Sequence, residues 1–122
     1  MKGTVQIGDT QVEMLANAAS PFLYRKIFKK DFLLEMDPAK DIDTNAITEM
    51  GFVMHMQTQK TFKEIIDTVT VEDFYGWLMQ YEALDVPLAS GDIFALFKGQ
   101  EKTLSTQKKS RRKRRGSRQQ RS

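Results

Sequence analysis

The chain has 122 residues, of which 19 are Lys or Arg, 16 are Asp or Glu and none is Cys. The absence of cysteine excludes a disulfide framework and any chemistry that needs a thiolate. No stretch approaches the roughly 18 apolar residues that would cross a bilayer, and the first residues, MKGTVQIGDTQVEM, lack the long apolar run of a secretory signal. We therefore expect a soluble, cytoplasmic protein that makes no membrane contact.

The charge is divided unevenly along the chain. The last sixteen residues, QKKSRRKRRGSRQQRS, contain nine basic residues and no acidic one. The first 106 residues therefore keep 10 basic against 16 acidic residues, a net charge of −6. A folded nucleic-acid-binding domain usually carries its basic residues on the folded surface, where they displace counterions from phosphates. We expect one globular domain over residues 1–99 and a disordered basic tail over 100–122, where Leu104 is the only apolar residue.

The N-terminal residues have the pattern of a β-hairpin. Polar and apolar side chains alternate in Thr4–Ile7 and in Gln11–Leu15, and Gly8-Asp9-Thr10 between them supplies turn residues. An isolated hairpin is marginally stable in water, so its apolar face must pack on helices or on another copy of the protein.

Two longer helices should follow. Ser20 and Pro21 have the residue types of an N-cap and a first helical position, and the helix should end before the Asp37-Pro38 pair. The next helix begins near Asp41 and continues to Gln59, with apolar residues spread over an arc of roughly 220°. Such a helix is either central and covered on several sides, or it exposes apolar surface to a partner.

Three shorter helices complete the expected fold. An apolar stripe of Phe62, Ile65, Ile66 and Val69 favours a helix over a strand. Thr70 should cap the following helix, whose core row is Phe74, Trp77, Leu78 and Tyr81. A last helix is expected from Asp92 to about Lys98, after Pro87 and Gly91 have interrupted the chain. The predicted fold class is α+β, mainly α-helical, with an N-terminal β-hairpin followed by four to five helices.

No residue pattern predicts catalysis, a cofactor or a metal. His55 is the only histidine, and its helical neighbours include no carboxylate, so we expect an ordinary surface or boundary residue. The aspartates Asp37, Asp41 and Asp43 lack the glycine and glutamate of a calcium-binding EF-hand loop, and Asp41 or Asp43 is better explained as a helix cap. No phosphate-binding glycine motif is present. The sequence predicts a protein that is not an enzyme and has no catalytic, cofactor-binding or metal site.

Apolar residues off the expected core rows are candidates for partner binding. Met50 and Met54 should be core, since they lie in the main arc of their helix. A partner-binding surface is predicted at Phe52, Met56, Tyr75 and Met79. For Tyr75 and Met79 the alternative is packing against a neighbouring helix of the same chain.

The basic tail leaves several possibilities open. One alternative is a solvated extension without a partner. A second is an arginine-rich segment for nuclear localisation or RNA binding, and a third is the product of a shifted reading frame. If the tail binds nucleic acid, the residues are Lys108, Lys109, Arg111, Arg112, Lys113, Arg114, Arg115 and Arg118.

Three quoted runs carry a resemblance to a known family. IGDTQVEMLANAASPFLYRKIFKKDFLLEM, VEDFYGWLMQYEALD and ALFKGQEKT, in that order, resemble the tail assembly chaperones of long-tailed bacteriophages and prophages of Gram-positive bacteria. The similarity covers roughly residues 1–106. The basic tail departs from the mixed-charge terminus that is commoner in that family.

The resemblance implies a non-catalytic role. Such chaperones are made in the host cytoplasm, coat the tape-measure protein before tail tube subunits assemble, and are absent from the mature virion. It therefore implies the tape-measure and tail tube proteins as partners, self-association of many copies, and in many such genes a longer product made by a programmed frameshift. The alternative is a small nucleic-acid-binding or regulatory protein that acts through its tail.

Overall fold

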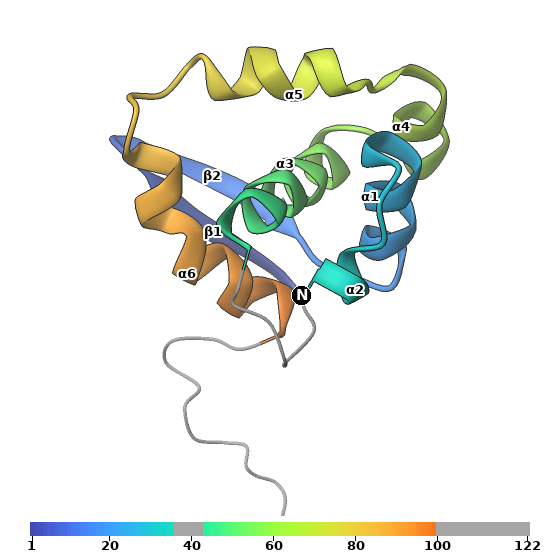
Figure 1. The fold of residues 1–122 in the computed structure, drawn as a ribbon, viewed down its shortest axis with the longest axis horizontal. Helices are drawn as coiled ribbons and strands as arrows, with labels where there is room; N and C mark the ends of the chain where they lie inside the picture. The colour runs from blue at the N-terminus through green and yellow to red at the C-terminus, as the bar shows by residue number, and fades with distance from the viewer. Residues whose placement is uncertain (36–42, 100–122) are drawn as a thin grey trace, which may run out of the picture.

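The computed structural model describes residues 1–35 and 43–99. The elements are β1 (Lys2–Ile7), β2 (Thr10–Leu15), α1 (Ala19–Phe28), α2 (Phe32–Glu35), α3 (Thr44–Gln59), α4 (Phe62–Thr68), α5 (Val71–Leu78) and α6 (Asp85–Phe97). α3 lies at the centre, with α1 on one side, α6 on the other and α5 across the top (Figure 1). The predicted fold class, mainly helical with an N-terminal hairpin, is confirmed for these residues.

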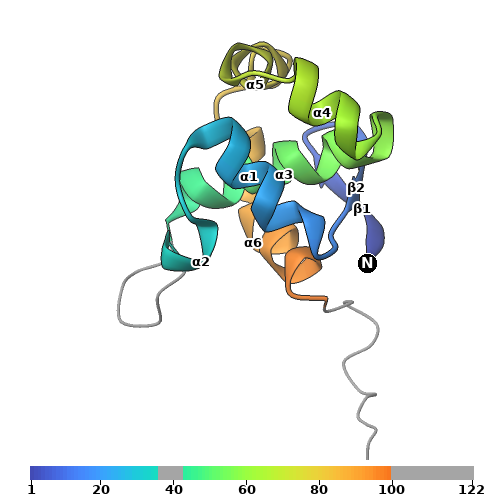
Figure 2. The same ribbon diagram turned by 90° about the vertical axis from the view of Figure 1, so that its right-hand side faces the viewer.

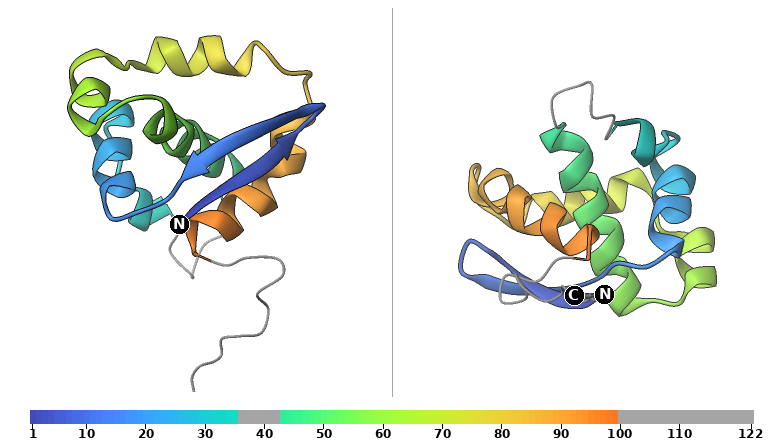
Figure 3. Two further views of the ribbon diagram at one scale, coloured as in Figure 1. Left: turned by 180° about the vertical axis from the view of Figure 1, so that it is seen from behind. Right: turned by 90° about the horizontal axis from the view of Figure 1, so that it is seen from below.

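The hairpin is antiparallel, with Val5 opposite Val12 and a two-residue turn at Gly8 and Asp9. Gly8 has a φ of 60°, which suits the first turn position of a type II′ hairpin. Alternate side chains of both strands are buried, so one face of the hairpin packs against α3 and α6. Of the two predicted alternatives for this face, packing on helices or on another copy of the protein, the structure shows packing on helices. Figure 3 shows the strands crossing the back of the molecule.

The single helix predicted from Pro21 to the Asp37-Pro38 pair is divided into α1 and α2, which raises the number of described helices to six. Lys29 takes a left-handed conformation with φ 61° and ends α1, and the carboxylate of Asp31 accepts a hydrogen bond from the Leu33 N–H at the start of α2. In an unbroken helix Phe32 would point roughly 130° away from the buried face of α1. The break turns Phe32 into the core, where it is 1% exposed.

The start of α1 also differs from the prediction. Ser20 is not the N-cap, because α1 begins at Ala19. Instead, the Asn17 side-chain oxygen accepts a hydrogen bond from the Ala19 N–H at 2.9 Å. The Ser20 hydroxyl is fully buried and donates to Gln57 Oε1 at 2.6 Å, which links α1 to α3. The sequence pattern predicted that the Ser20 hydroxyl caps α1, but in the structure it makes a tertiary hydrogen bond to α3.

α3 is the central helix, which resolves the two possibilities left open by its wide apolar arc. It packs against β2, α1, α2, α4, α5 and α6. Seen from below, α3 lies between α6 and α1 (Figure 3), and Figure 2 shows α5 above α1 and α3. The helix begins at Thr44, capped by the Asp43 carboxylate, which accepts hydrogen bonds from the N–H groups of Asn45 and Ala46. The predicted capping role of Asp43 is confirmed.

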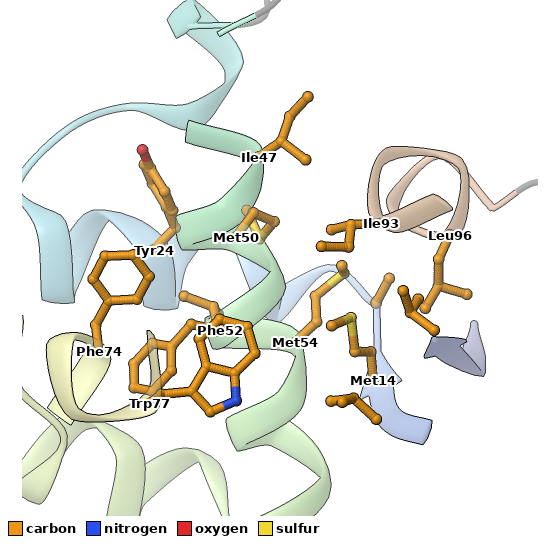
Figure 4. Packing of buried hydrophobic residues seen from close by; sticks show 14 of the residues in the cluster. Met14, Tyr24, Ile47, Met50, Phe52, Met54, Phe74, Trp77, Ile93 and Leu96 are labelled. Carbon is orange, nitrogen blue, oxygen red and sulfur yellow. The ribbon is translucent and has the colours of Figure 1, made fainter. Parts of the chain in front are cut away.

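The buried side chains of α3 serve two parts of one core (Figure 4). On one side Phe52 lies with Phe74 and Trp77, and on the other Met54 lies with Met14 and Ile93. The predicted core residues Met50 and Met54 are both fully buried.

α6 begins seven residues earlier than the predicted start at Asp92. Pro87 lies in its first turn, where a missing N–H breaks no intrahelical hydrogen bond. Gly91 is exposed within the helix, and a methyl group at this position would meet no atom within 4 Å. Neither residue interrupts the helix, because its buried face of Val86, Ala89, Ile93 and Leu96 is continuous.

Candidate protein-binding groove

α5 stands over the C-terminal half of α3, and local capping fixes where α4 and α5 begin. Thr61 and Glu64 form a capping box at α4, and Thr70 and Asp73 form the predicted cap at α5 as a second box. In each box the threonine oxygen accepts from a backbone N–H, and the carboxylate accepts from the threonine N–H. The hydrogen bonds from Thr61 hold the pKa of the Glu64 carboxyl below its ordinary value.

An open groove of about 760 Å³ separates α3 from α5. Its apolar lining comes from Phe52, Met56, Val69 and Trp77. Its polar lining comes from His55, Gln59, Lys60, Thr68, Glu72, Asp73, Gly76 and Gln80. A groove of mixed polar and apolar lining between two helices suits an amphipathic peptide segment.

The floor of the groove is built from packed aromatic rings. The Trp77 ring centroid lies 5.7 Å from that of Phe52 and 5.5 Å from that of Tyr81. Phe74 packs edge-on to Phe52 at 5.5 Å and to Phe28 of α1 at 5.1 Å. These contacts join α1, α3 and α5, so the floor is held from three helices.

Of the four predicted partner-binding residues, two line this groove. Met56 is half-buried and lines it, and its role in partner binding stays a prediction. Phe52 also lines it but is only 1% exposed, so its prediction as an exposed contact is wrong. Phe52 is core because α5 covers the second side of the α3 arc, and its ring supports the floor instead of projecting from it.

Tyr75 and Met79 lie on the opposite, outward side of α5. They are 56% and 85% exposed, so neither packs against a neighbouring helix. The helical spacing correctly placed them off the core row, but the prediction that they share one surface with Met56 is wrong, since neither lines the groove. The structure therefore separates the predicted surface into a groove under α5 and an apolar stripe on top of it.

His55 has a structural position beside the groove. Its Nδ1 lies 2.8 Å from the backbone carbonyl oxygen of Glu13, and its ring stacks on Trp77 with centroids 6.3 Å apart. A carbonyl only accepts, so Nδ1 carries the proton of this hydrogen bond. The prediction of a boundary residue is confirmed, and the contact ties β2 to the groove.

A second polar connection holds α1 against α3. The buried Tyr24 hydroxyl donates to the Glu49 carboxylate at 2.7 Å, and Lys30 Nζ lies 3.0 Å from the same carboxylate. Burial, followed by the hydrogen bond to Glu49, raises the pKa of Tyr24 well above its ordinary range. The arrangement links α1 to α3 and opposes ionisation of the phenol at alkaline pH.

Some predicted residues lie outside the described part of the chain. These are Asp37, Asp41 and the basic residues of the tail, Lys108, Lys109, Arg111, Arg112, Lys113, Arg114, Arg115 and Arg118. Within residues 1–35 and 43–99, no three His, Cys, Asp or Glu side chains are grouped as a metal site. No helix in the same residues has the length and apolar character needed to cross a membrane.

Several exposed apolar residues were missed by the sequence pattern. Spacing along the sequence predicts Phe22 on one apolar face of its helix with Leu23 and Ile27, but Phe22 is 70% exposed. Leu88 on α6 is 81% exposed. Phe22 lies on the side of α1 away from its buried residues Ser20, Leu23, Tyr24 and Ile27, and Leu88 lies off the buried face of α6. Comparison with known proteins found no matching family model, no matching curated protein and no matching solved structure.

Proposed function

We propose that this protein is a phage tail assembly chaperone that binds an amphipathic helix of the tape-measure protein in the groove between α3 and α5. The observation that supports this most directly is the groove itself, an opening of about 760 Å³ with Phe52, Met56 and Trp77 in its lining. Binding in this mode requires apolar surface on a fixed support and no acid, base or metal. The identity of the partner comes from the resemblance of residues 1–106 to the tail assembly chaperones, which implies the tape-measure protein.

The groove chemistry supports a helical partner with apolar residues on one face. Met56 is half-buried and adaptable, while Trp77 and Phe52 are held by neighbouring rings. The edges carry Lys60 from the end of α3 and Glu72 from α5. A partner helix that buries its apolar face here would leave its polar flanks beside charged groups of both signs. The tail tube protein is the second proposed partner, and the site of action is the host cytoplasm.

Fluorescence provides a direct test because Trp77 is the only tryptophan of the chain and lines the groove. The full chain is titrated with tryptophan-free tape-measure fragments from the same phage or prophage, and emission is recorded. Binding in the groove is expected to change the intensity and the emission maximum. A soluble complex in size-exclusion chromatography with light scattering should accompany the change.

Two variants separate groove binding from binding elsewhere. Met56→Asp places a charge in the groove and should weaken binding at least roughly tenfold. Leu88→Asp, on α6 and absent from the groove lining, should leave the affinity for a single fragment unchanged. If both variants bind equally well, or if no fragment binds while the full chain binds RNA with a steep salt dependence, the groove is not the site and the tail is the functional element.

A further inference from the structure

Two exposed faces lie outside the groove, on opposite sides of the fold. The first, which we term the α1 face, comprises Phe22, Arg25, Lys26, Lys29, Leu33 and Leu34. All six residues are exposed, and the exposed fractions of Phe22, Leu33 and Leu34 are 70%, 61% and 67%. The neighbouring Lys30 is paired with Glu49 and is not counted in this face. The α1 face thus combines apolar side chains with three positive charges.

The second face has the same apolar character and the opposite charge. It comprises the exposed residues Met79, Glu82, Leu84 and Leu88, at the corner where α5 leads into α6, and the half-buried Asp85, whose carboxylate accepts a hydrogen bond from the Glu82 N–H. We term it the α6 face. Met79, Leu84 and Leu88 are 85%, 66% and 81% exposed. From residue 64 to residue 97 the chain carries seven acidic residues and no basic one. No part of the α6 face therefore repels a basic partner.

We propose that the α1 face of one copy binds the α6 face of the next, so that the protein assembles head to tail. Charge complementarity identifies the partner as a second copy, because both faces expose apolar side chains and their charges are opposite. α1 and α6 lie on opposite sides of α3 in Figures 1 and 3, so one chain cannot bring its own two faces together. The proposal concerns the chain alone and does not depend on the groove or on its partner.

Symmetric pairing is disfavoured by the same charges. A two-fold dimer through the α1 face would oppose Arg25, Lys26 and Lys29 to their own copies, and one through the α6 face would oppose carboxylates. A contact between two different faces leaves one of each free at the ends. Such a contact gives a closed ring if the repeated rotation closes and an open array if it does not, and in both cases the assembly grows with protein concentration.

The expected association has a clear dependence on salt. Screening shortens the range of exposed charges from about 10 Å at 0.1 M salt to about 3 Å at 1 M. The apolar side chains of both faces are insensitive to such screening, so association should weaken in high salt without vanishing. In sedimentation velocity, the average mass of the full chain should rise with protein concentration and fall between these salt concentrations.

The decisive test uses two variants that each lose one face. Phe22→Gln with Arg25→Gln removes the α1 face, and Leu84→Gln with Leu88→Gln removes the α6 face. At concentrations where the wild type associates, each variant alone should be monomeric, with affinity lowered at least roughly tenfold. An equimolar mixture keeps one intact pair of faces, so it should form a 1:1 dimer and nothing longer.

Controls make every outcome informative. Phe62→Gln, at a half-exposed α4 residue outside both faces, should associate like the wild type, and circular dichroism should show all variants folded. The proposal is wrong if the wild type stays monomeric at about 0.1 mM in low salt, if either double variant still associates, or if the mixture does not dimerise. It is also wrong if deleting residues 107–122 abolishes association while the α1-face variant retains it, since the tail would then be the basic partner.

Discussion

Replacing Trp77 with Ala tests whether α5 is packed on α3 as the groove requires. Trp77 is 6% exposed and contacts the rings of Phe52, Phe74 and Tyr81. Burying an indole of roughly 200 Å² at about 25 cal/mol per Å² is worth up to about 5 kcal/mol. The open groove beside it lets the site relax, so we expect a loss of about 3 kcal/mol, at the lower end for buried aromatic residues.

Urea unfolding followed by far-UV circular dichroism measures this loss, since the variant lacks the only tryptophan. With a urea dependence of about 1.5 kcal/mol/M, the midpoint should fall by about 2 M. Tyr75→Ala is the matched control, because Tyr75 lies two residues away on α5 and is 56% exposed. It should change the free energy of unfolding by less than about 0.5 kcal/mol. A loss below about 1 kcal/mol for Trp77→Ala, or equal losses for both variants, would refute the packing of α5.

Three further perturbations have distinct expected results. Gly8→Ala should lower the free energy of unfolding by about 1–3 kcal/mol, because φ is 60° and the new Cβ would lie 2.4 Å from Asp85 Oδ2. Gly76→Ala should raise the free energy of unfolding by up to about 1 kcal/mol, because a Cβ there meets no atom within 4 Å. Both are measured by urea unfolding. The raised pKa of Tyr24 means that the folded state keeps a proton that the unfolded state loses, so its contribution is complete below pH of about 10 and is lost above it. Unfolding measured between about pH 9 and 11 should therefore show a smaller alkaline loss for Tyr24→Phe than for the wild type. Deleting residues 107–122 should leave the far-UV spectrum and thermal midpoint nearly unchanged, and a large loss of stability would show that the tail belongs to the fold.

Features with a local cause could be predicted from the sequence. The hairpin follows from strict alternation around Gly8, and the α5 cap follows from Thr70 with Asp73 three residues later. Each depends on a few neighbouring residues whose geometry is the same in any protein. The buried row of α5, with Phe74 and Trp77, was predicted for the same reason.

Features that depend on distant residues could not be predicted in this way. Ser20 is a good local cap, but Gln57 of α3 provides a buried acceptor for its hydroxyl. The break at Lys29 is favoured by the burial of Phe32 against Phe97, with ring centroids 4.8 Å apart, although 65 residues separate them in the chain. The groove has the same limitation: periodicity gives the width of the apolar arc on α3, but not that α5 covers Phe52 while leaving Met56 half-buried.

The two proposals together predict how binding should depend on the length of the partner helix. A folded body of about 90 residues is roughly 30 Å across, the length of about 20 helical residues. Successive copies in a head-to-tail array are related by one repeated operation, so each groove has the same position relative to the next. A fragment of about 20 residues should then bind one copy, and one of about 40 residues should bind two copies more tightly than two separate short fragments, because the second contact is intramolecular. Light scattering and fluorescence titration measure both quantities. The gain should disappear in the Leu84→Gln, Leu88→Gln variant while binding of the short fragment persists, and a gain that survives in this variant would mean that neighbouring copies do not touch through the α6 face.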